Sequence, residues 1–195
     1  MAMYAWHFDF SVSLLWTIDA FLSPAECTAI LEEQRRADWL PATINGATGR
    51  IVDARVRSST TAVVHDAGLA ERLYARVLPR LPQVMVDQVG GRPRRVKPVG
   101  IYQPLRIYRY EPGQQFAPHH DQSYQDESGR RSLLTFMIYL NEDFTGGTTT
   151  FPDQKQEIHP RTGRALLFQH MLLHCGERVV SGSKYVLRSD IIFGE

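Results

Sequence analysis

Short apolar runs separated by polar, glycine-containing turns characterise the second half of the chain. Residues 133–140 form a continuous run of mostly large apolar side chains, a pattern typical of a strand that is buried on both faces. Turn-forming residues follow this run. Further strand-like segments lie at 105–110, 148–151, 165–168 and 185–193. Many short strands joined by such turns predict a β-sandwich or a β-barrel.

The first half of the chain mixes helical and extended patterns. Residues 23–26 form a capping box, with serine at the N-cap, proline at the first helical position and glutamate at the third. This box predicts a helix that continues to about Arg36. Apolar residues recur at helical spacing over 66–79, which predicts a second, amphipathic helix. The intervening residues 41–56 contain glycines and mixed polar residues, so we expect a long loop or a hairpin there.

Composition and charge exclude several classes of protein. At 195 residues the chain suits one domain, and a hydrophobic fraction of 43% with a charged fraction of 22% is normal for a globular protein. The net charge of +1 provides no global field for nucleic acid or a membrane surface. No apolar run approaches the roughly 20 residues that span a bilayer. We therefore predict neither partner, and we interpret the basic run 92–97 as a solvated loop.

The cysteines and the first residues bear on the cellular compartment. Cys27 and Cys175 are the only cysteines and lie far apart in the sequence, so two free thiols in a reducing compartment are the better interpretation. Residues 1–16 are apolar, but Asp9 interrupts them and no basic segment precedes them, which argues against a signal peptide. We expect a cytoplasmic protein.

Three residues form a candidate metal site. His119 and Asp121 are two apart, and on an extended segment residues two apart project from the same face, with alpha carbons about 7 Å apart. His174 follows later in the chain. Two histidines and one carboxylate on one face of an octahedral ion are diagnostic of non-heme Fe(II) oxygenases. The rival His120 points to the opposite face from Asp121, and the rival His170 lacks the flanking pattern described next.

Several longer stretches strengthen this interpretation. Residues 110–121 follow the pattern Y-x-x-G-x-x-F-x-x-H-x-D, residues 139–151 contain Y-L-N followed by G-G-x-T-x-F, and residues 174–184 follow H-x-G-x-x-V-x-x-G-x-K. Together with the entry helix at 21–27, these stretches resemble the prolyl 4-hydroxylase-like 2-oxoglutarate, Fe(II)-dependent dioxygenases. The likeness covers nearly the whole chain.

The resemblance implies a role for each matching residue. His119, Asp121 and His174 would hold Fe(II). Lys184 would pair with the distal carboxylate of 2-oxoglutarate, a physically strong partnership for an ammonium in a small cavity. Tyr110 would give the same carboxylate a phenolic hydrogen bond. The implied cofactors are Fe(II), 2-oxoglutarate and O2, with ascorbate as a further candidate.

A second group of residues is assigned from strand parity. Lys184 and Arg188 share one face of a strand. Arg188 could therefore meet a substrate or cosubstrate carboxylate, although the family pattern fixes only the lysine and a surface position is the alternative. Within 133–140, Thr135 and Tyr139 are the only polar residues that could face the 2-oxoglutarate pocket.

These observations predict a mainly β fold with flanking N-terminal α-helices, namely a double-stranded β-helix, the jelly roll shared by cupins. We expect a single dioxygenase domain over 1–195. Residues 1–99 would provide helical and strand support, and residues 100–195 would form the catalytic jelly-roll core.

The predicted reaction is hydroxylation of an aliphatic carbon with release of succinate and CO2. We favour a peptidyl residue such as proline, in part because the resemblance implies it, since protein prolyl hydroxylases share the signature. In addition, the polar segments 41–56 and 123–131 are long enough to line an open groove; the second is either a plain loop or a lid. A free amino acid or small natural product is an alternative substrate, with Arg188 and Arg106 available for its carboxylate. The balanced charge and the spacing of Lys184 argue against a nucleic-acid demethylase of the same fold. A non-catalytic metal-binding cupin would be expected to lack one of the three metal ligands or the cosubstrate lysine, and this sequence has them all. The oligomeric state stays open.

Overall fold

The structure is a computed structural model, and it describes residues 14–46, 49–64, 66–89 and 92–195. Most of the segment on which the signal-peptide prediction depends, residues 1–13, lies outside these ranges. Neither described helix has the length and apolar composition needed to cross a membrane.

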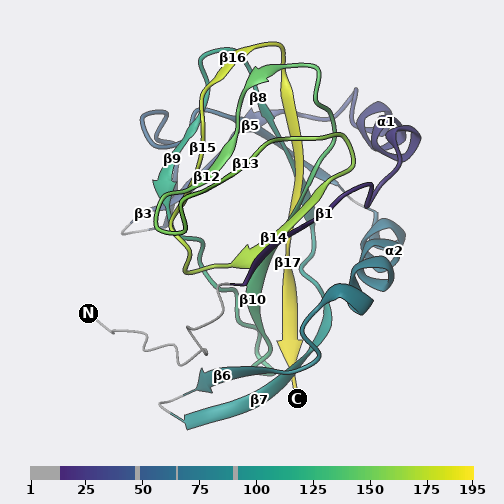
Figure 1. The fold of residues 1–195 in the computed structure, drawn as a ribbon, viewed down its shortest axis with the longest axis vertical. Helices are drawn as coiled ribbons and strands as arrows, with labels where there is room; N and C mark the ends of the chain where they lie inside the picture. Colours follow the sequence, from purple (N-terminus) through teal and green to yellow (C-terminus); the bar gives the residue numbers. More distant parts are fainter. Residues whose placement is uncertain (1–13, 47–48, 65, 90–91) are drawn as a thin grey trace.

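A large antiparallel sheet of nine strands forms the centre of the fold (Figure 1). Its main path runs in the order β1 (Leu15–Ile18), β14 (Ala165–Gln169), β10 (Arg131–Tyr139), β17 (Lys184–Gly194), β8 (Leu105–Tyr110), β5 (Thr60–Val64) and β2 (Leu40–Pro41). The long strand β17 also pairs with β7 (Arg92–Ile101), which pairs with β6 (Met85–Val89). The β6–β7 hairpin projects from the end of the molecule near the C-terminus (Figure 1).

A smaller antiparallel sheet faces one side of the large one. It contains, in spatial order, β13 (Gln156–Ile158), β12 (Thr149–Phe151), β15 (His174–Gly176) and β9 (Phe116–His119). Two further strand pairs are β11 (Thr145–Gly146) with β16 (Val179–Ser181), and β3 (Ile44–Gly46) with β4 (Gly49–Ile51). Two facing antiparallel sheets with these crossings form the predicted jelly roll.

Both predicted helices are present. The capping box begins α1 (Pro24–Glu33): the Ser23 hydroxyl accepts from the Glu26 backbone N–H, and the Glu26 carboxylate accepts from the Ser23 backbone N–H. The second helix, α2 (Ala67–Val77), begins at an Asp66 cap and continues into a 3₁₀ turn over Leu78–Arg80. Both helices lie on the side of the large sheet away from the small sheet (Figure 1).

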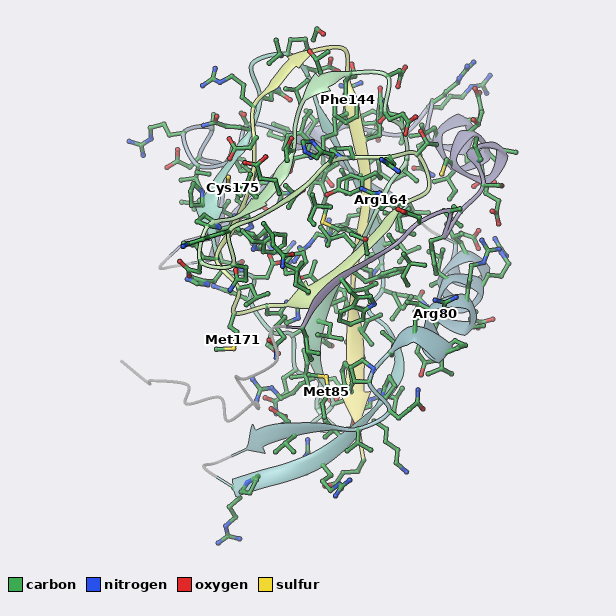
Figure 2. The ribbon with its side chains drawn as sticks, viewed as in Figure 1. Arg80, Met85, Phe144, Arg164, Met171 and Cys175 are labelled. Carbon is green, nitrogen blue, oxygen red and sulfur yellow. The ribbon has the colours of Figure 1, made fainter. Side chains whose placement is uncertain are left out.

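Strand parity separates the two cores. On β10, Phe136 and Ile138 face the helices and join the larger apolar cluster, which includes Leu73 of α2. The alternate residue Tyr139 belongs to the cluster between the two sheets. Figure 2 shows side chains filling the space on both sides of the large sheet. The expectation that this strand is buried on both faces is confirmed.

Three segments expected to be irregular can now be described. The basic run 92–97 was expected to be a solvated loop. Most of it is exposed, as expected, but it is not a loop: it lies in β7, where pairing with β6 and the burial of Val96 hold it extended. The 41–56 segment contains the β3–β4 hairpin. The 123–131 segment is irregular and ends in a bridge between Gln125 and Arg131. Because strands from both halves join one sheet and β7 crosses residue 100, we keep the single domain as a prediction.

Candidate active site

The two predicted metal-binding histidines lie directly opposite each other. Strands β9 and β15 pair so that His119 and His174 are register partners, and Asp121 lies two residues beyond the end of β9. The Nε2 atom of His119 is 3.6 Å from one Asp121 oxygen, and the Nε2 atom of His174 is 3.6 Å from the other. One potential ligand atom from each of the three residues lies within 4.8 Å of the other two. The sheet pairing therefore brings together residues that are distant in sequence.

The hydrogen bonds of both histidines leave the correct nitrogen free. His119 Nδ1 lies 2.8 Å from the Ala117 carbonyl oxygen, and His174 Nδ1 lies 2.9 Å from the Leu172 carbonyl oxygen. A carbonyl can only accept, so each Nδ1 carries a proton and each Nε2 is the ring nitrogen that lies near Asp121. Burial, the largest influence, lowers the pKa of His174 to about 4, which keeps its ring neutral near pH 7. A neutral imidazole is the form that binds a metal.

Asp121 is buried and held by two donors. Arg188 contacts one carboxylate oxygen at 2.8 Å, and the Thr135 hydroxyl donates to the other at 2.6 Å. Burial alone would raise the pKa of Asp121, but Arg188 and the neighbouring histidines outweigh it and hold the pKa well below its usual value. The carboxylate is therefore an anion, as a metal ligand must be.

The two rival histidines lie outside this cluster. His120 is exposed and its Nδ1 lies 2.9 Å from the Met171 carbonyl oxygen. His170 is buried behind Thr135, with its Nδ1 3.1 Å from the threonine hydroxyl, and burial lowers its pKa. His170 thus supports the group that holds Asp121 and does not face the other candidate ligands.

Lys184 lies at the closed end of the site. It is almost fully buried, and its ammonium donates to the Gly147 carbonyl at 2.6 Å. Its nitrogen lies 5.5 Å from the centre of the Tyr110 ring and 5.4 Å from that of Tyr139. Burial is the main cause that lowers the pKa of Lys184 to about 7. Gly147 has a positive φ of 64°, and a side chain there would press on the lysine stem at 3.1 Å.

A small cavity of about 50 Å³ joins the lysine to the three candidate ligands. Tyr110, Thr135, Lys184 and Arg188 all line it. Tyr139 is instead fully buried beneath it, where its hydroxyl donates to Thr149 at 2.7 Å. Thr149 in turn lines the cavity.

Arg57 is a site residue that the sequence patterns did not indicate. Its guanidinium lies 3.8 Å from the centre of the Tyr108 ring and donates to the Tyr110 hydroxyl at 3.4 Å and to Ser59 at 3.1 Å. It also packs on Phe116, whose ring stacks on His119. Arg57 comes from an irregular segment far upstream of the motifs, so no spacing in the sequence links it to them.

A larger cavity of about 440 Å³ opens from the same ligands. His119, Asp121 and Arg188 line both cavities. Several residues of the segment 41–56 line this cavity, whereas only Ser123 and Tyr124 of the segment 123–131 do. The Asn45 amide donates at 2.7 Å to Gln122, which directly precedes the second segment. One side of the ligand cluster is therefore closed by Lys184, and the other is open to a substrate-sized space.

Part of the chain resembles known oxygenases. Residues 105–189 match the family model of the 2OG-Fe(II) oxygenase superfamily. Over 100 residues the chain is 35% identical to a relative from Acanthamoeba polyphaga mimivirus, covering 42% of this chain and 41% of that protein. It is 27% identical over 191 residues to prolyl 4-hydroxylase 1 of Arabidopsis thaliana, covering 85% of this chain and 64% of the relative.

The fold also resembles that of solved prolyl hydroxylase structures. The structure matches a prolyl hydroxylase in complex with a hypoxia inducible factor oxygen degradation domain peptide fragment, from Trichoplax adhaerens, with a TM-score of 0.64, 17% identity and coverage of 93% of this chain and 84% of the other. The predicted resemblance to the prolyl 4-hydroxylase-like 2-oxoglutarate/Fe(II) oxygenases is thus confirmed. The chain spans 41% to 64% of the length of the first curated relatives it matches.

Proposed function

We propose that this protein hydroxylates an aliphatic carbon of a peptidyl residue, proline being the first candidate, using 2-oxoglutarate and O2 and releasing succinate and CO2. The observation that carries the proposal is the arrangement of one buried lysine and three convergent ligand atoms along a single cavity. The larger cavity, on the other side of the candidate ligands, has room for a substrate.

The three candidate ligands fit the metal of this family. His119 and His174 offer their Nε2 atoms and Asp121 offers an anionic oxygen, which is the donor set of a non-heme iron site. When bound, Fe(II) supplies the activation of O2 that couples oxidative decarboxylation of 2-oxoglutarate to hydroxylation. The role of the protein is to orient the reactants and to exclude water.

Lys184 would hold the far carboxylate of 2-oxoglutarate. An ammonium buried at the end of a narrow cavity is costly without a partner, and a carboxylate would satisfy it. The Tyr110 hydroxyl, oriented by Arg57, would donate a second hydrogen bond to the same carboxylate. Thr135 and Arg188 would fix the Asp121 carboxylate from both sides, so that the metal is held in one orientation.

A peptide suits the larger cavity. Its walls include the hairpin β3–β4 and the segment after Asp121, which leave an extended opening. The prolyl hydroxylase of the Trichoplax adhaerens structure binds a peptide fragment, which supports the same substrate class here. Ascorbate as a further cofactor and the cytoplasm as the compartment belong to this proposal; the buried, unpaired Cys27 and Cys175 agree with a reducing compartment.

The test is oxygen-dependent succinate release with proline-containing peptides, beside the twenty free amino acids, followed by mass spectrometry of the product. We expect a 16 Da gain on a peptide in proportion to succinate. Coupled turnover with a free amino acid and with none of the peptides would refute the peptidyl substrate and retain the reaction. Absence of 2-oxoglutarate turnover under every condition would refute the hydroxylase itself.

A further inference from the structure

Two arginines lie side by side on the floor of the larger cavity. Arg106 of β8 and Arg188 of β17 are direct register partners in the large sheet, and both line the cavity. Like charges placed opposite each other on neighbouring strands destabilise a sheet unless they are compensated. The two arginines therefore need negative partners, and they differ in whether the chain provides them.

Among the described residues, Arg188 has carboxylate partners and Arg106 has none. Arg188 contacts Asp121 at 2.8 Å and Asp190 at 3.5 Å. Within the described parts of the chain, Arg106 has no ion-pair or hydrogen-bond partner, although it is partly buried. A partly buried guanidinium that faces a cavity without a partner is the complement of an anionic group on a ligand.

The lining of the cavity is positive as a whole. Four arginines line it, namely Arg50, Arg57, Arg106 and Arg188, against two aspartates, Asp121 and Asp190. Both aspartates are partners of Arg188. The remaining three guanidiniums have no carboxylate on the cavity wall. The neutral net charge of the chain conceals this local surplus.

The lining of the small cavity indicates that Arg106 is not a second anchor for 2-oxoglutarate, because it includes Lys184 and Arg188 but not Arg106. Lys184 pairs with Tyr110, and the Arg188–Arg106 pair lies four residues along the same two strands. At a rise of about 3.3 Å per residue, the alpha carbons of the two pairs are about 13 Å apart along the strands. Asp121, in contact with Arg188, lies between the lysine end and the opening to the larger cavity. Arg106 thus faces the substrate side of the candidate metal site.

We propose that Arg106 binds a carboxylate of the substrate, and that this carboxylate lies close in sequence to the carbon that is hydroxylated. This inference rests on the proposed hydroxylase and names the chemical class of its substrate. Three sources would supply the same chemistry: an acidic side chain next to the modified residue, the C-terminus of a peptide, and the α-carboxylate of a free amino acid. Arg50, exposed on β4 at the rim, would attract the same anion during entry.

The experiment measures binding without turnover. Labelled proline-containing peptides are titrated anaerobically into protein loaded with Fe(II) and 2-oxoglutarate. Three pairs of peptides differ only by glutamate or glutamine directly before, directly after or two residues after the proline. The peptides of a fourth pair end directly after the proline, one with a free C-terminus and the other with an amidated one. The fifth pair is free proline and prolinamide, which are used as competitors.

The matched variants are Arg106→Gln and Arg109→Gln. Arg109 is on the same strand but faces the other way, where it pairs with Glu111 and packs on Trp39, so its loss controls for removal of a β8 arginine. We expect the charged member of at least one pair to bind about 10- to 100-fold more tightly, as one charge-assisted hydrogen-bonding partner provides. Arg106→Gln should abolish that preference, and Arg109→Gln should keep it.

Equal binding of the two members of every pair, or a preference that survives Arg106→Gln, would overturn the assignment. The pair that shows the preference identifies the source of the carboxylate. Succinate release by the same peptides in air tests the hydroxylase separately. A charge preference in binding without any product would refute the hydroxylase and keep the anion site, whereas product formation with equal binding of neutral and acidic peptides would do the reverse.

Discussion

Arg188 and Asp121 form an ion pair of 2.8 Å inside the candidate active site, so that a predicted metal ligand is also one half of a partly buried salt bridge. In the absence of a metal, the arginine provides the main positive charge near this carboxylate. A bound divalent ion would take over part of that role. The stability of the metal-free and metal-loaded proteins should therefore respond differently to changes at Arg188.

Replacement of Arg188 by methionine should destabilise the metal-free protein more than the loaded one. The Asp121 carboxylate is buried, and removing one partner of a buried pair costs about 3–5 kcal/mol because the other charge is left uncompensated. A metal ion restores a positive charge at the same carboxylate. Urea unfolding of wild-type and Arg188→Met protein, with and without added Mn²⁺ in the absence of air, measures the difference. An equal loss of stability in both states would contradict the coupling.

The three candidate ligands should be separable from their rivals by substitution. His119→Ala, Asp121→Ala and His174→Ala should each abolish iron binding and turnover, because each removes one of three convergent donors. His120→Ala and His170→Ala should retain iron, since neither faces the cluster. Metal content after reconstitution, measured beside 2-oxoglutarate turnover, checks both statements. Iron retained in His119→Ala and lost in His120→Ala would reverse the assignment.

Lys184→Ala should weaken 2-oxoglutarate binding far more than iron binding. Loss of the partner of a buried carboxylate corresponds to about 3–5 kcal/mol. Tyr110→Phe removes only a hydrogen bond to a charged group and should cost about 1–3 kcal/mol. Calorimetric titration of 2-oxoglutarate into the Mn²⁺-loaded variants gives both values. If Lys184→Ala binds 2-oxoglutarate as the wild type does, another residue holds that carboxylate.

The affinity for 2-oxoglutarate should fall as the pH rises above neutrality. Burial lowers the pKa of Lys184 to about 7 in the protein without cosubstrate, whereas a bound carboxylate favours the ammonium and raises that pKa. Binding above pH 7 therefore requires uptake of a proton. The affinity should be highest below pH 7. Above pH 7 it should decrease about tenfold per pH unit, until the pH reaches the pKa that Lys184 has with 2-oxoglutarate bound. Titrations between pH 6 and pH 9 check the slope.

A Lys184→Met variant is the control for this pH dependence. It lacks the titrating ammonium, so its weak residual affinity should vary little over the same range. An affinity of the wild type that stays constant from pH 6 to pH 9 would show that Lys184 is charged before the cosubstrate arrives.

Features with a short sequence period could be predicted from the sequence. The capping box at Ser23 predicted the first helix, and the continuous apolar run predicted β10, because both depend on neighbours within a few residues. Strand parity likewise placed Lys184 and Arg188 on one face, and both line the small cavity. The spacing of two residues between His119 and Asp121 predicted that their side chains project from the same face of an extended segment.

The tertiary structure decided which distant residues meet. The register of β9 with β15 places His174 opposite His119, and the fold brings Arg57 onto Tyr108 from a segment without any motif. Only the pairing of β8 with β17 puts Arg106 beside Arg188. A local pattern fixes the face on which a side chain lies. Which strands become neighbours, and in which register, depends on packing over the whole chain, and this determines the partner of each charge.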